Sequence, residues 1–257
     1  MLKTIIFGRN GFIAKSLYKY INKNKISNFE FYSKKQIDLL NLKDNPKLKK
    51  LTNKKVKVIF ISCIAPAKNL NDVSKNIFML NNFFNSVNIN NISHLTYISS
   101  DAVYSDTKEV ITEKSETLPK SYHGMMHLIR ENLISNYIGS NRLCILRPTL
   151  IYGKGDTHGG YGPNLFYKKV KYSETINIFG NGSEKRDHVH INDVIESIYL
   201  SSQKNSNGIF NISSGEVITF KEIAKTILKK FNSESDIIHL KRHSPMPHLG
   251  FRFISNL

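Results

Sequence analysis

The first seventeen residues constrain the fold of this chain more than any other stretch. Residues 2–7 (Leu-Lys-Thr-Ile-Ile-Phe) crowd apolar side chains without helical spacing, which predicts a short buried strand. The turn Gly8–Gly11 follows at once, and residues 12–17 then carry apolar side chains at the spacing of a helix. A strand, a glycine turn and a helix are the opening of a nucleotide-binding βαβ unit, in which a pyrophosphate lies at the positive helix N-terminus.

The residues of this turn have distinct expected roles. Gly8 permits the tight turn, and Gly11 lets a pyrophosphate approach the backbone. Ala14 stands where a third glycine of the pattern would lie, and it is small enough for close packing of the helix against the strand. The predicted cofactor contacts are Gly8, Asn10, Gly11, Phe12 and Ile13. The alternative at this point is an ordinary strand-to-helix turn, and the rest of the chain must decide.

A second predicted strand, residues 29–32, bears on the choice of cofactor. The residue at the end of this strand usually meets the adenosine ribose: an acidic side chain accepts from the 2′-hydroxyl, whereas basic side chains accommodate a 2′-phosphate. Here the strand ends in Ser33, Lys34 and Lys35, which leans toward NADP and marks Ser33 and Lys34 as cofactor contacts. The alternative is that these are ordinary solvated side chains of a lysine-rich chain.

Strands and helices go on alternating along the chain. Strands are predicted at residues 56–62, 95–99 and 143–147, and helices at residues 75–87 and 122–137. This alternation predicts an α/β fold with a right-handed, doubly wound parallel sheet of the Rossmann type. Small residues after the strand at 56–62, among them Ala65, suit a cofactor that lies across the carboxyl edge of the sheet.

The composition of the sequence changes after residue 153, where glycines and prolines are concentrated in a stretch expected to form loops. The elements predicted after it are shorter. We therefore predict a dinucleotide-binding domain at residues 1–160 and a small C-terminal substrate-binding lobe at residues 161–257. A strand near residues 208–213 is expected to return to the first domain. The lobe itself is expected to be incomplete at its C-terminal end.

Composition narrows the class of partner. The net charge of +17 comes from lysines scattered among Asn and Ile, so no nucleic-acid partner is predicted, while a basic cleft would suit a nucleotide diphosphate. The sequence has no run of eighteen apolar residues, so no membrane span is expected. Cys63 and Cys144 lie far apart in apolar runs, and the N-terminus enters a strand without the pattern of a signal peptide. Reduced thiols and a cytoplasmic location are therefore expected.

Further stretches form an ordered series with the opening turn. They are Asn76 in the helix at 75–87, Ser99–Tyr104, Arg147–Gly153, Gly162–Asn164 and Phe179–Asp193. Together they resemble the motifs of the extended short-chain dehydrogenases/reductases, in particular the NAD-dependent epimerase/dehydratase family that acts on nucleotide sugars. The resemblance covers nearly the whole chain, and the order of the motifs supports it more than any single one.

The resemblance implies roles for several residues. It places the family's catalytic Ser or Thr on Ser100, with Ser99, Asn76 and Pro148 beside the cofactor. It implies that Asn164 contacts the sugar diphosphate and that Arg186 grips the nucleotide phosphates, as a guanidinium can do in a bidentate manner. The alternative for Arg186 is an ion pair with a neighbouring carboxylate.

The family's central pair, a Tyr with a Lys four residues later, is broken here. If Tyr122 is the acid/base, the lysine position falls on Met126, which carries no charge. If Gly124 keeps its family place, His123 replaces the tyrosine and His127 replaces the lysine, and this second register is preferred. The candidate catalytic residues are therefore Ser100, Tyr122, His123 and His127, and His127 is also a candidate cofactor contact. Two histidines four apart also suggest zinc, but the sequence places no third ligand, so no metal is predicted.

One further departure bears on the reaction. Some dehydratases of the family carry an Asp-Glu pair after the catalytic Ser or Thr, whereas this chain has Asp101 followed by Ala102, which disfavours dehydration. Asp101 remains a candidate substrate contact. The resemblance thus implies an NAD(P)-dependent epimerase or ketone reductase of a nucleotide sugar, serving polysaccharide synthesis, and it leaves a homodimer open. The alternative is a relative that binds a dinucleotide without turnover.

Overall fold

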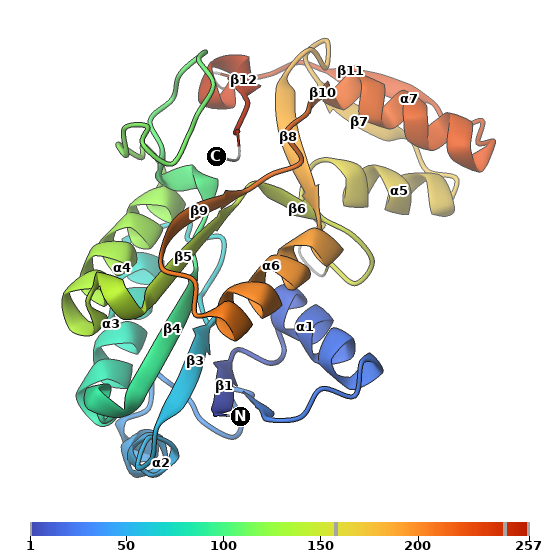
Figure 1. Ribbon diagram of the computed structural model, residues 1–257. Coiled ribbons are helices and arrows are strands. Elements are labelled where there is room, and N and C mark those ends of the chain that lie inside the picture. The colour runs from blue at the N-terminus through green and yellow to red at the C-terminus, as the bar shows by residue number, and fades with distance from the viewer. Residues whose placement is uncertain (1, 157–158, 244–245, 256–257) are drawn as a thin grey trace.

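A six-stranded parallel sheet forms the centre of the molecule (Figure 1). The computed structural model describes residues 2–156, 159–243 and 246–255. The strands of this sheet lie in the order β2 (Phe29–Tyr32), β1 (Lys3–Phe7), β3 (Val56–Phe60), β4 (Ile92–Ile98), β5 (Leu143–Pro148) and β9 (Gly208–Ile212). Each strand pairs in parallel with its neighbours. The predicted doubly wound sheet of the Rossmann type is therefore confirmed.

Helices cover both faces of this sheet. One face carries α1 (Phe12–Lys23) and α6 (Ile191–Lys204), and the other carries α2 (Asn45–Leu51), α3 (Leu70–Ser86) and α4 (Tyr122–Ile138). Strands buried on both faces read as continuous apolar runs, which explains the opening stretch of the sequence. In β1, Ile5 and Phe7 enter the core under α3 and α4, while Ile6 enters the core under α1 and α6.

The direction of winding reverses beside β1. The chain passes from β1 through α1 to β2 on one side, and then crosses to β3 on the other side. At such a switch point the loops diverge, and a crevice opens outside the carboxyl ends of the two strands. The glycine turn after β1 and the loop after β3 therefore border the same opening.

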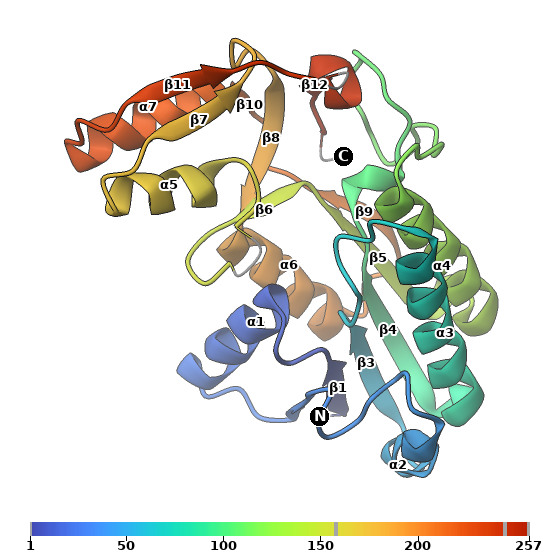
Figure 2. The same ribbon diagram turned by 180° about the vertical axis from the view of Figure 1, so that it is seen from behind.

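The remaining elements form a smaller lobe beside the carboxyl edge of the sheet (Figure 2). Its strands are β6 (Leu150–Tyr152), β7 (Ile176–Phe179), β8 (Lys185–His190), β10 (Val217–Thr219), β11 (Ile237–Leu240) and β12 (Phe251–Arg252), and its helices are α5 (Pro163–Lys171) and α7 (Phe220–Phe231). Strand β8 pairs with β6, β10 and β12, while β7 pairs with β11. Phe166, Ile176, Ile178 and Phe220 form the small core between these strands and helices.

Two segments tie the lobe to the sheet. Strand β9 follows α6 and pairs with β5 at the edge of the main sheet. Farther on, Ile254 is fully buried against Val103, Tyr104 and Ile111. The chain therefore crosses between the two parts more than once, and a boundary at residue 160 stays a prediction.

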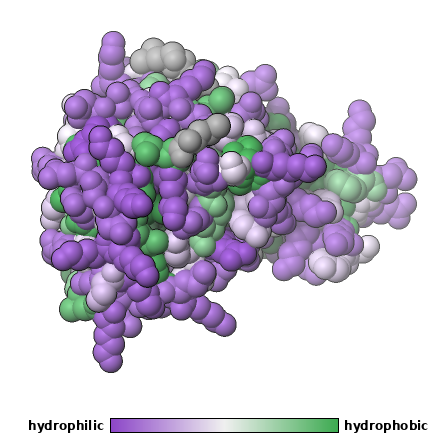
Figure 3. Space-filling view, turned by 60° about the horizontal axis from the view of Figure 1, so that its bottom comes forward, coloured by the Kyte–Doolittle hydropathy of each residue, from purple (hydrophilic) through white to green (hydrophobic). Residues whose placement is uncertain are grey.

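The surface reflects the scattered lysines of the sequence. Hydrophilic residues spread over most of the face seen in Figure 3, and apolar residues emerge only in small areas between them. In the described part of the chain, no helix is long and apolar enough to cross a membrane.

Candidate active site

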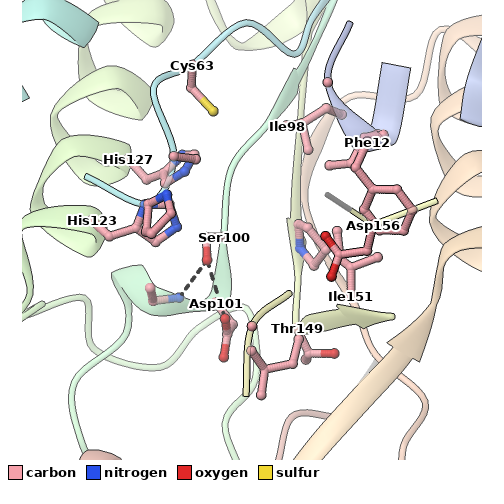
Figure 4. Close-up of a pocket in the computed structure, with 18 of the residues that line it drawn as sticks. Phe12, Cys63, Ile98, Ser100, Asp101, His123, His127, Thr149, Ile151 and Asp156 are labelled. Atoms are coloured by element: carbon pink, nitrogen blue, oxygen red, sulfur yellow. Dashed lines mark hydrogen bonds between the residues drawn. The ribbon is translucent and has the colours of Figure 1, made fainter. Parts of the chain in front are cut away.

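A cleft of about 990 Å³ lies between the carboxyl edge of the main sheet and the lobe. Most of the predicted site residues line it: Gly8, Asn10, Gly11, Phe12, Ile13, Lys34, Ala65, Ser99, Ser100, Asp101, His123, His127, Pro148, Asn164 and Arg186. Figure 4 shows His123, His127 and Ser100 on one side of the cleft, with Phe12, Ile151 and Asp156 on the other. One cavity thus joins residues from both parts of the chain.

The glycine turn forms one end of this cleft. Gly8 has φ of +101°, a conformation that favours glycine, and a Cβ there would lie 3.0 Å from the Ser62 hydroxyl oxygen. Gly11 precedes α1, whose first turn contains no acidic side chain. The first N–H groups of a helix lack intrahelical partners and favour an anion. The turn therefore has the shape and polarity that a dinucleotide pyrophosphate requires.

Three predicted site residues lie outside the cleft lining. Asn76 is fully buried behind the loop after β3, where it accepts from the Ile64 N–H at 2.9 Å and donates to the Ile64 carbonyl at 3.0 Å. Its role in the structure is to hold that loop rather than to face the cavity. The Ser33 hydroxyl donates to the Gln36 side chain, and Ser33 does not line the cleft. Tyr122 is 47% exposed at the start of α4, because the helix turns its side chain away from the cleft.

The start of α4 positions the two histidines. The Ser121 hydroxyl accepts from the Gly124 N–H at 3.0 Å and caps the helix. Residues four apart share one helix face, so His123 and His127 both line the cleft, with ring centroids 4.7 Å apart and planes at 89°. Gly124 lies against the short turn Asp101–Val103 that follows β4: a Cβ there would lie 2.1 Å from the Ala102 carbonyl oxygen.

His127 is held in a buried, positively charged setting. Its Nδ1 lies 2.7 Å from the Tyr97 hydroxyl, and only 3% of the residue is exposed. Burial lowers the pKa of His127 well below 6.5, and the neighbouring His123 and the Arg130 guanidinium lower it further. His127 is therefore a neutral imidazole near pH 7. It offers the cleft a hydrogen bond, whereas a lysine at this position would offer a charge.

The end of β4 carries Ser100 into the cleft. The Ser100 hydroxyl accepts from the Ala102 N–H at 3.2 Å and lies 3.4 Å from Asp101 Oδ1 (Figure 4). The Asp101 carboxylate also accepts from Nε of Arg252 at 3.2 Å. Asp101 is thus partly engaged with the C-terminal segment while it lines the cavity.

Two residues behind the cleft hold β4, α4 and β5 together. The Glu131 carboxylate accepts from Arg147 Nε at 3.0 Å and from Arg147 Nη2 at 2.6 Å, and both side chains are almost fully buried. Ser99 donates its hydroxyl to Glu131. Although Ser99 lines the cleft, its hydroxyl is therefore already committed to this network.

The lobe contributes a cluster of charges. Arg186 Nε and Nη2 donate to Glu184 Oε1 at 2.8 and 2.6 Å, and Arg242 Nη2 donates to Glu184 Oε2 at 2.8 Å. Two guanidinium groups thus share one carboxylate, so this cluster of three side chains carries a net positive charge where it lines the cleft. The ion pair considered as an alternative for Arg186 exists, but Arg186 lines the cavity at the same time.

Two polar residues lie close to this cluster. Asn164 accepts from the Gly153 N–H at 3.0 Å and donates to Asp156 at 2.8 Å, so it supports the loop at the cleft rim. Nδ1 of His188 lies 3.2 Å from the Arg186 carbonyl oxygen, which can only accept, so Nδ1 carries the proton. Nε2 of His188 is buried and has no hydrogen-bond partner among the described residues. Burial lowers the pKa of His188 to about 4, so this nitrogen is an acceptor on the cleft lining.

Sequence reasoning missed several residues of this site: Tyr97, Arg130, Glu184, His188, Arg242 and Arg252. The partner of Tyr97 lies 30 residues away along the chain, and the partner of Arg252 lies 151 residues away. No local spacing in the sequence signals such contacts. Glu184 lies two residues from Arg186, so the sequence indicates it as an ion-pair partner of Arg186 but gives no sign that Arg242 shares it. Within the part of the chain that the structure describes, no three metal-ligating side chains come together.

Comparison with known proteins agrees with this geometry. Residues 4–213 match the model of the NAD dependent epimerase/dehydratase family. The dTDP-4-dehydro-6-deoxyglucose reductase of Escherichia coli is 28% identical over 174 residues, which are 65% of this chain and 54% of that protein. The chain thus matches about half the length of this curated relative.

Two solved structures show the same fold. The UDP-glucose 4-epimerase of Thermus thermophilus in complex with NAD superposes with a TM-score of 0.85 at 17% identity, covering 99% of this chain and 90% of that chain. A dTDP-4-dehydrorhamnose reductase of Clostridium acetobutylicum superposes with a TM-score of 0.79 at 16% identity, covering 98% and 90%. With more than three quarters of its sequence matched by the family model, the chain belongs to the NAD dependent epimerase/dehydratase family.

Proposed function

We propose that this protein is an NAD(P)-dependent epimerase or ketone reductase of a nucleotide sugar, in which His123 and His127 stand in place of the family's Tyr and Lys. The observation that carries the proposal is the continuity of the cleft. It joins the glycine turn at α1, the two histidines of α4 and the Arg186–Glu184–Arg242 cluster of the lobe. These three parts suit a dinucleotide, a reacting sugar and a diphosphate, in that order.

The cofactor would lie along the carboxyl ends of β1, β3 and β4. Gly8 and Gly11 would face its pyrophosphate, while Ala65, Pro148 and His127 would face its nicotinamide half. When bound, the nicotinamide gives or takes a hydride, a transfer that no side chain can perform. The related structure from Thermus thermophilus contains NAD, which supports this assignment.

In this proposal, His123 is the residue that transfers the proton of the reaction. When the carbonyl carbon of a keto sugar gains a hydride, its oxygen must gain a proton, and the reverse step removes one. An imidazole can both give and take a proton near neutral pH, and it does not need a lysine to make this possible. Ser100, on the same side of the cleft, would donate a hydrogen bond to that oxygen (Figure 4).

The lobe would hold the nucleotide diphosphate. The Arg186–Glu184–Arg242 cluster keeps a net positive charge, and Nε of Arg242 is buried without a hydrogen-bond partner among the described residues. A diphosphate satisfies such guanidinium donors better than water does. The acceptor Nε2 of His188 would face a hydroxyl or N–H of the same ligand, because a phosphate oxygen cannot donate to it.

The cofactor is proposed to be NADP rather than NAD. Lys34 lines the cleft after β2, and no acidic residue follows that strand before Asp38, which pairs with Lys34 at 3.6 Å. Titration calorimetry should therefore give a lower Kd for NADPH than for NADH. Lys34→Gln should raise the Kd for NADPH by about threefold to tenfold, as loss of an exposed charge contact does, and leave the Kd for NADH unchanged. Lys35→Gln is the matched control, since Lys35 does not line the cleft; equal effects of both variants would refute the preference.

A homodimer is also proposed, through α3 and α4. Phe78 on α3 and Tyr122, Met125 and Ile129 on α4 are each 39% to 47% exposed, and the two helices pack side by side. A second copy of the chain would cover these side chains. Sedimentation velocity should show a dimer for the native chain and a monomer for Met125→Glu.

The experiment that tests the function combines the purified protein with NAD⁺, NADP⁺, NADH or NADPH and a panel of UDP- and dTDP-linked sugars and keto sugars, because a sugar must first be oxidised to be epimerised. Absorbance of the reduced cofactor reports reduction, and chromatography of the sugars reports epimerisation. We expect conversion of at least one sugar. Binding of cofactor and sugar without any conversion would instead support a dinucleotide-binding relative without turnover.

A further inference from the structure

Tyr97 lies behind the histidine pair and has no place in the roles assigned so far. It is a residue of β4, its side chain is 1% exposed, and its hydroxyl lies 2.7 Å from Nδ1 of His127. Among the described residues, Nδ1 of His127 is the hydrogen-bond partner that the structure gives to the Tyr97 hydroxyl. A buried hydroxyl without an acceptor is costly, so the identity of the donor in this pair is constrained.

The position of the proton follows from the chemistry of the two groups. A neutral imidazole carries one proton, on Nδ1 or on Nε2. If Nδ1 carried it, Nδ1 would donate to the phenol oxygen, and the buried phenol proton would lack an acceptor. If Nε2 carries it, Tyr97 donates to Nδ1, and both groups are satisfied. The second arrangement leaves the N–H of His127 on the nitrogen that remains available to the cleft.

The surroundings keep this pair in that state. The guanidinium of Arg130 lies 5.2 Å from the Tyr97 ring centroid and 5.1 Å from that of Phe60, and it donates to the Ser62 carbonyl at 2.9 Å. This fixed buried cation opposes a second positive charge on His127. Around the pair lie His123 of α4 and Cys63 of the loop after β3, and the carboxylate that acts on Tyr97 is Glu131 of α4. Burial raises the pKa of Tyr97, so the phenol keeps its proton.

We propose that Tyr97 is a positioning residue: it donates to Nδ1 of His127 and fixes that imidazole as the tautomer with its proton on Nε2. His127 then presents an N–H donor to the ribose of the nicotinamide half, as a neutral substitute for the ammonium of a lysine. His123 alone is left to transfer the proton of the reaction. The ribose contact rests on the proposed function, whereas the tautomer is a property of the protein by itself.

Nuclear magnetic resonance of protein labelled with nitrogen-15 histidine tests the tautomer directly. Near pH 7.5 we expect His127 to show a pyridine-type Nδ1 and a protonated Nε2, with the signal assigned by its loss in His127→Gln. Tyr97→Phe should convert this signal to a mixture of tautomers. Tyr104→Phe is the matched control, because Tyr104 is an equally buried tyrosine whose hydroxyl donates to Asn211 at 2.7 Å.

Affinity for the cofactor is the second measurement. Tyr97→Phe should raise the Kd for the reduced dinucleotide about threefold to tenfold, as expected for one misdirected hydrogen bond, while Tyr104→Phe leaves it unchanged. A protonated Nδ1 in the native protein, or a His127 spectrum insensitive to Tyr97→Phe, would overturn the proposal. The predicted tautomer in a protein that converts no sugar would refute the proposed function and leave the role of Tyr97 toward His127 intact.

Discussion

Gly124 is the residue that sets how closely α4 approaches the turn Asp101–Val103 that follows β4. Its Cα packs against the Ala102 backbone and Pro119, and an added Cβ would lie 2.1 Å from the Ala102 carbonyl oxygen and 2.6 Å from Cβ of Pro119. Both contacts involve atoms that cannot rotate away. The neighbouring His123 depends on this approach to reach the cleft beside Ser100.

Alanine at position 124 should therefore destabilise the protein. In an open helix, Gly→Ala stabilises by up to about 1 kcal/mol, but here overpacking should outweigh that gain and lower the free energy of unfolding by about 1–3 kcal/mol. Urea denaturation of Gly124→Ala measures the change. Asn132→Ala, on the exposed side of the same helix, should stay within about 0.5 kcal/mol of the native chain. A Gly124→Ala protein as stable as the native one would show that the contact is not tight.

Residue identities alone could predict part of this site. The glycine turn, Ser100 and Arg186 stand in local motifs, and the structure brings them into one cleft. The partners of Tyr97 and Arg252 could not be predicted, because they depend on which strands and loops meet in three dimensions. Local spacing also could not distinguish the two registers of α4, since Tyr122 and His123 are adjacent and both precede an apolar helix.

At the scale of elements, sequence patterns located the main strands and helices well. The predicted helix starts at residues 12 and 122 are those of α1 and α4, since glycine or serine precedes each. Helix α3 begins at Leu70 rather than at the predicted residue 75, because the Asn69 side chain caps it by accepting from the Asp72 N–H. The short strands β6, β10 and β12 were not predicted, because they exist only through pairing with β8.

Helix α3 also supplies the clearest test at this scale. Asn76 holds both backbone groups of Ile64, so Asn76→Ala should loosen the loop that carries Ala65 toward the cofactor. We expect the dinucleotide Kd to rise about tenfold, which corresponds to about 1.4 kcal/mol. Asn71→Ala, at an exposed position of the same helix, should leave the Kd unchanged in the same calorimetric titration. Equal affinities of the two variants would contradict this role of Asn76.

For the molecule as a whole, buried neutral histidines couple folding to pH. Burial lowers the pKa of three of them below 6.5: His94, His127 and His188. In the unfolded chain each would take up a proton near pH 6.5, but in the folded chain His188 does so only near pH 4. The unfolded state thus binds more protons between these values, and stability falls as the pH falls.

Urea denaturation at pH 7, 6 and 5 should show this trend. Each such histidine contributes up to about 1.4 kcal/mol of lost stability per pH unit within its window. His188→Asn removes one of these histidines and should make the loss of stability with falling pH less steep. The control is His239→Asn, at an exposed position of the lobe, which should leave that slope unchanged. A free energy of unfolding that stays constant from pH 7 to pH 5 would contradict the neutral, buried state of these side chains.

The central claim is that His123, and not Tyr122, carries the proton of the reaction. Its most direct test is the single-turnover rate of hydride transfer at saturating cofactor and sugar in the native chain, Tyr122→Phe and His123→Asn. We predict that Tyr122→Phe stays within about twofold of the native rate and that His123→Asn loses about 10²-fold to 10⁴-fold, the usual effect of removing a general acid/base. Loss of turnover in Tyr122→Phe, with a native rate in His123→Asn, would contradict it.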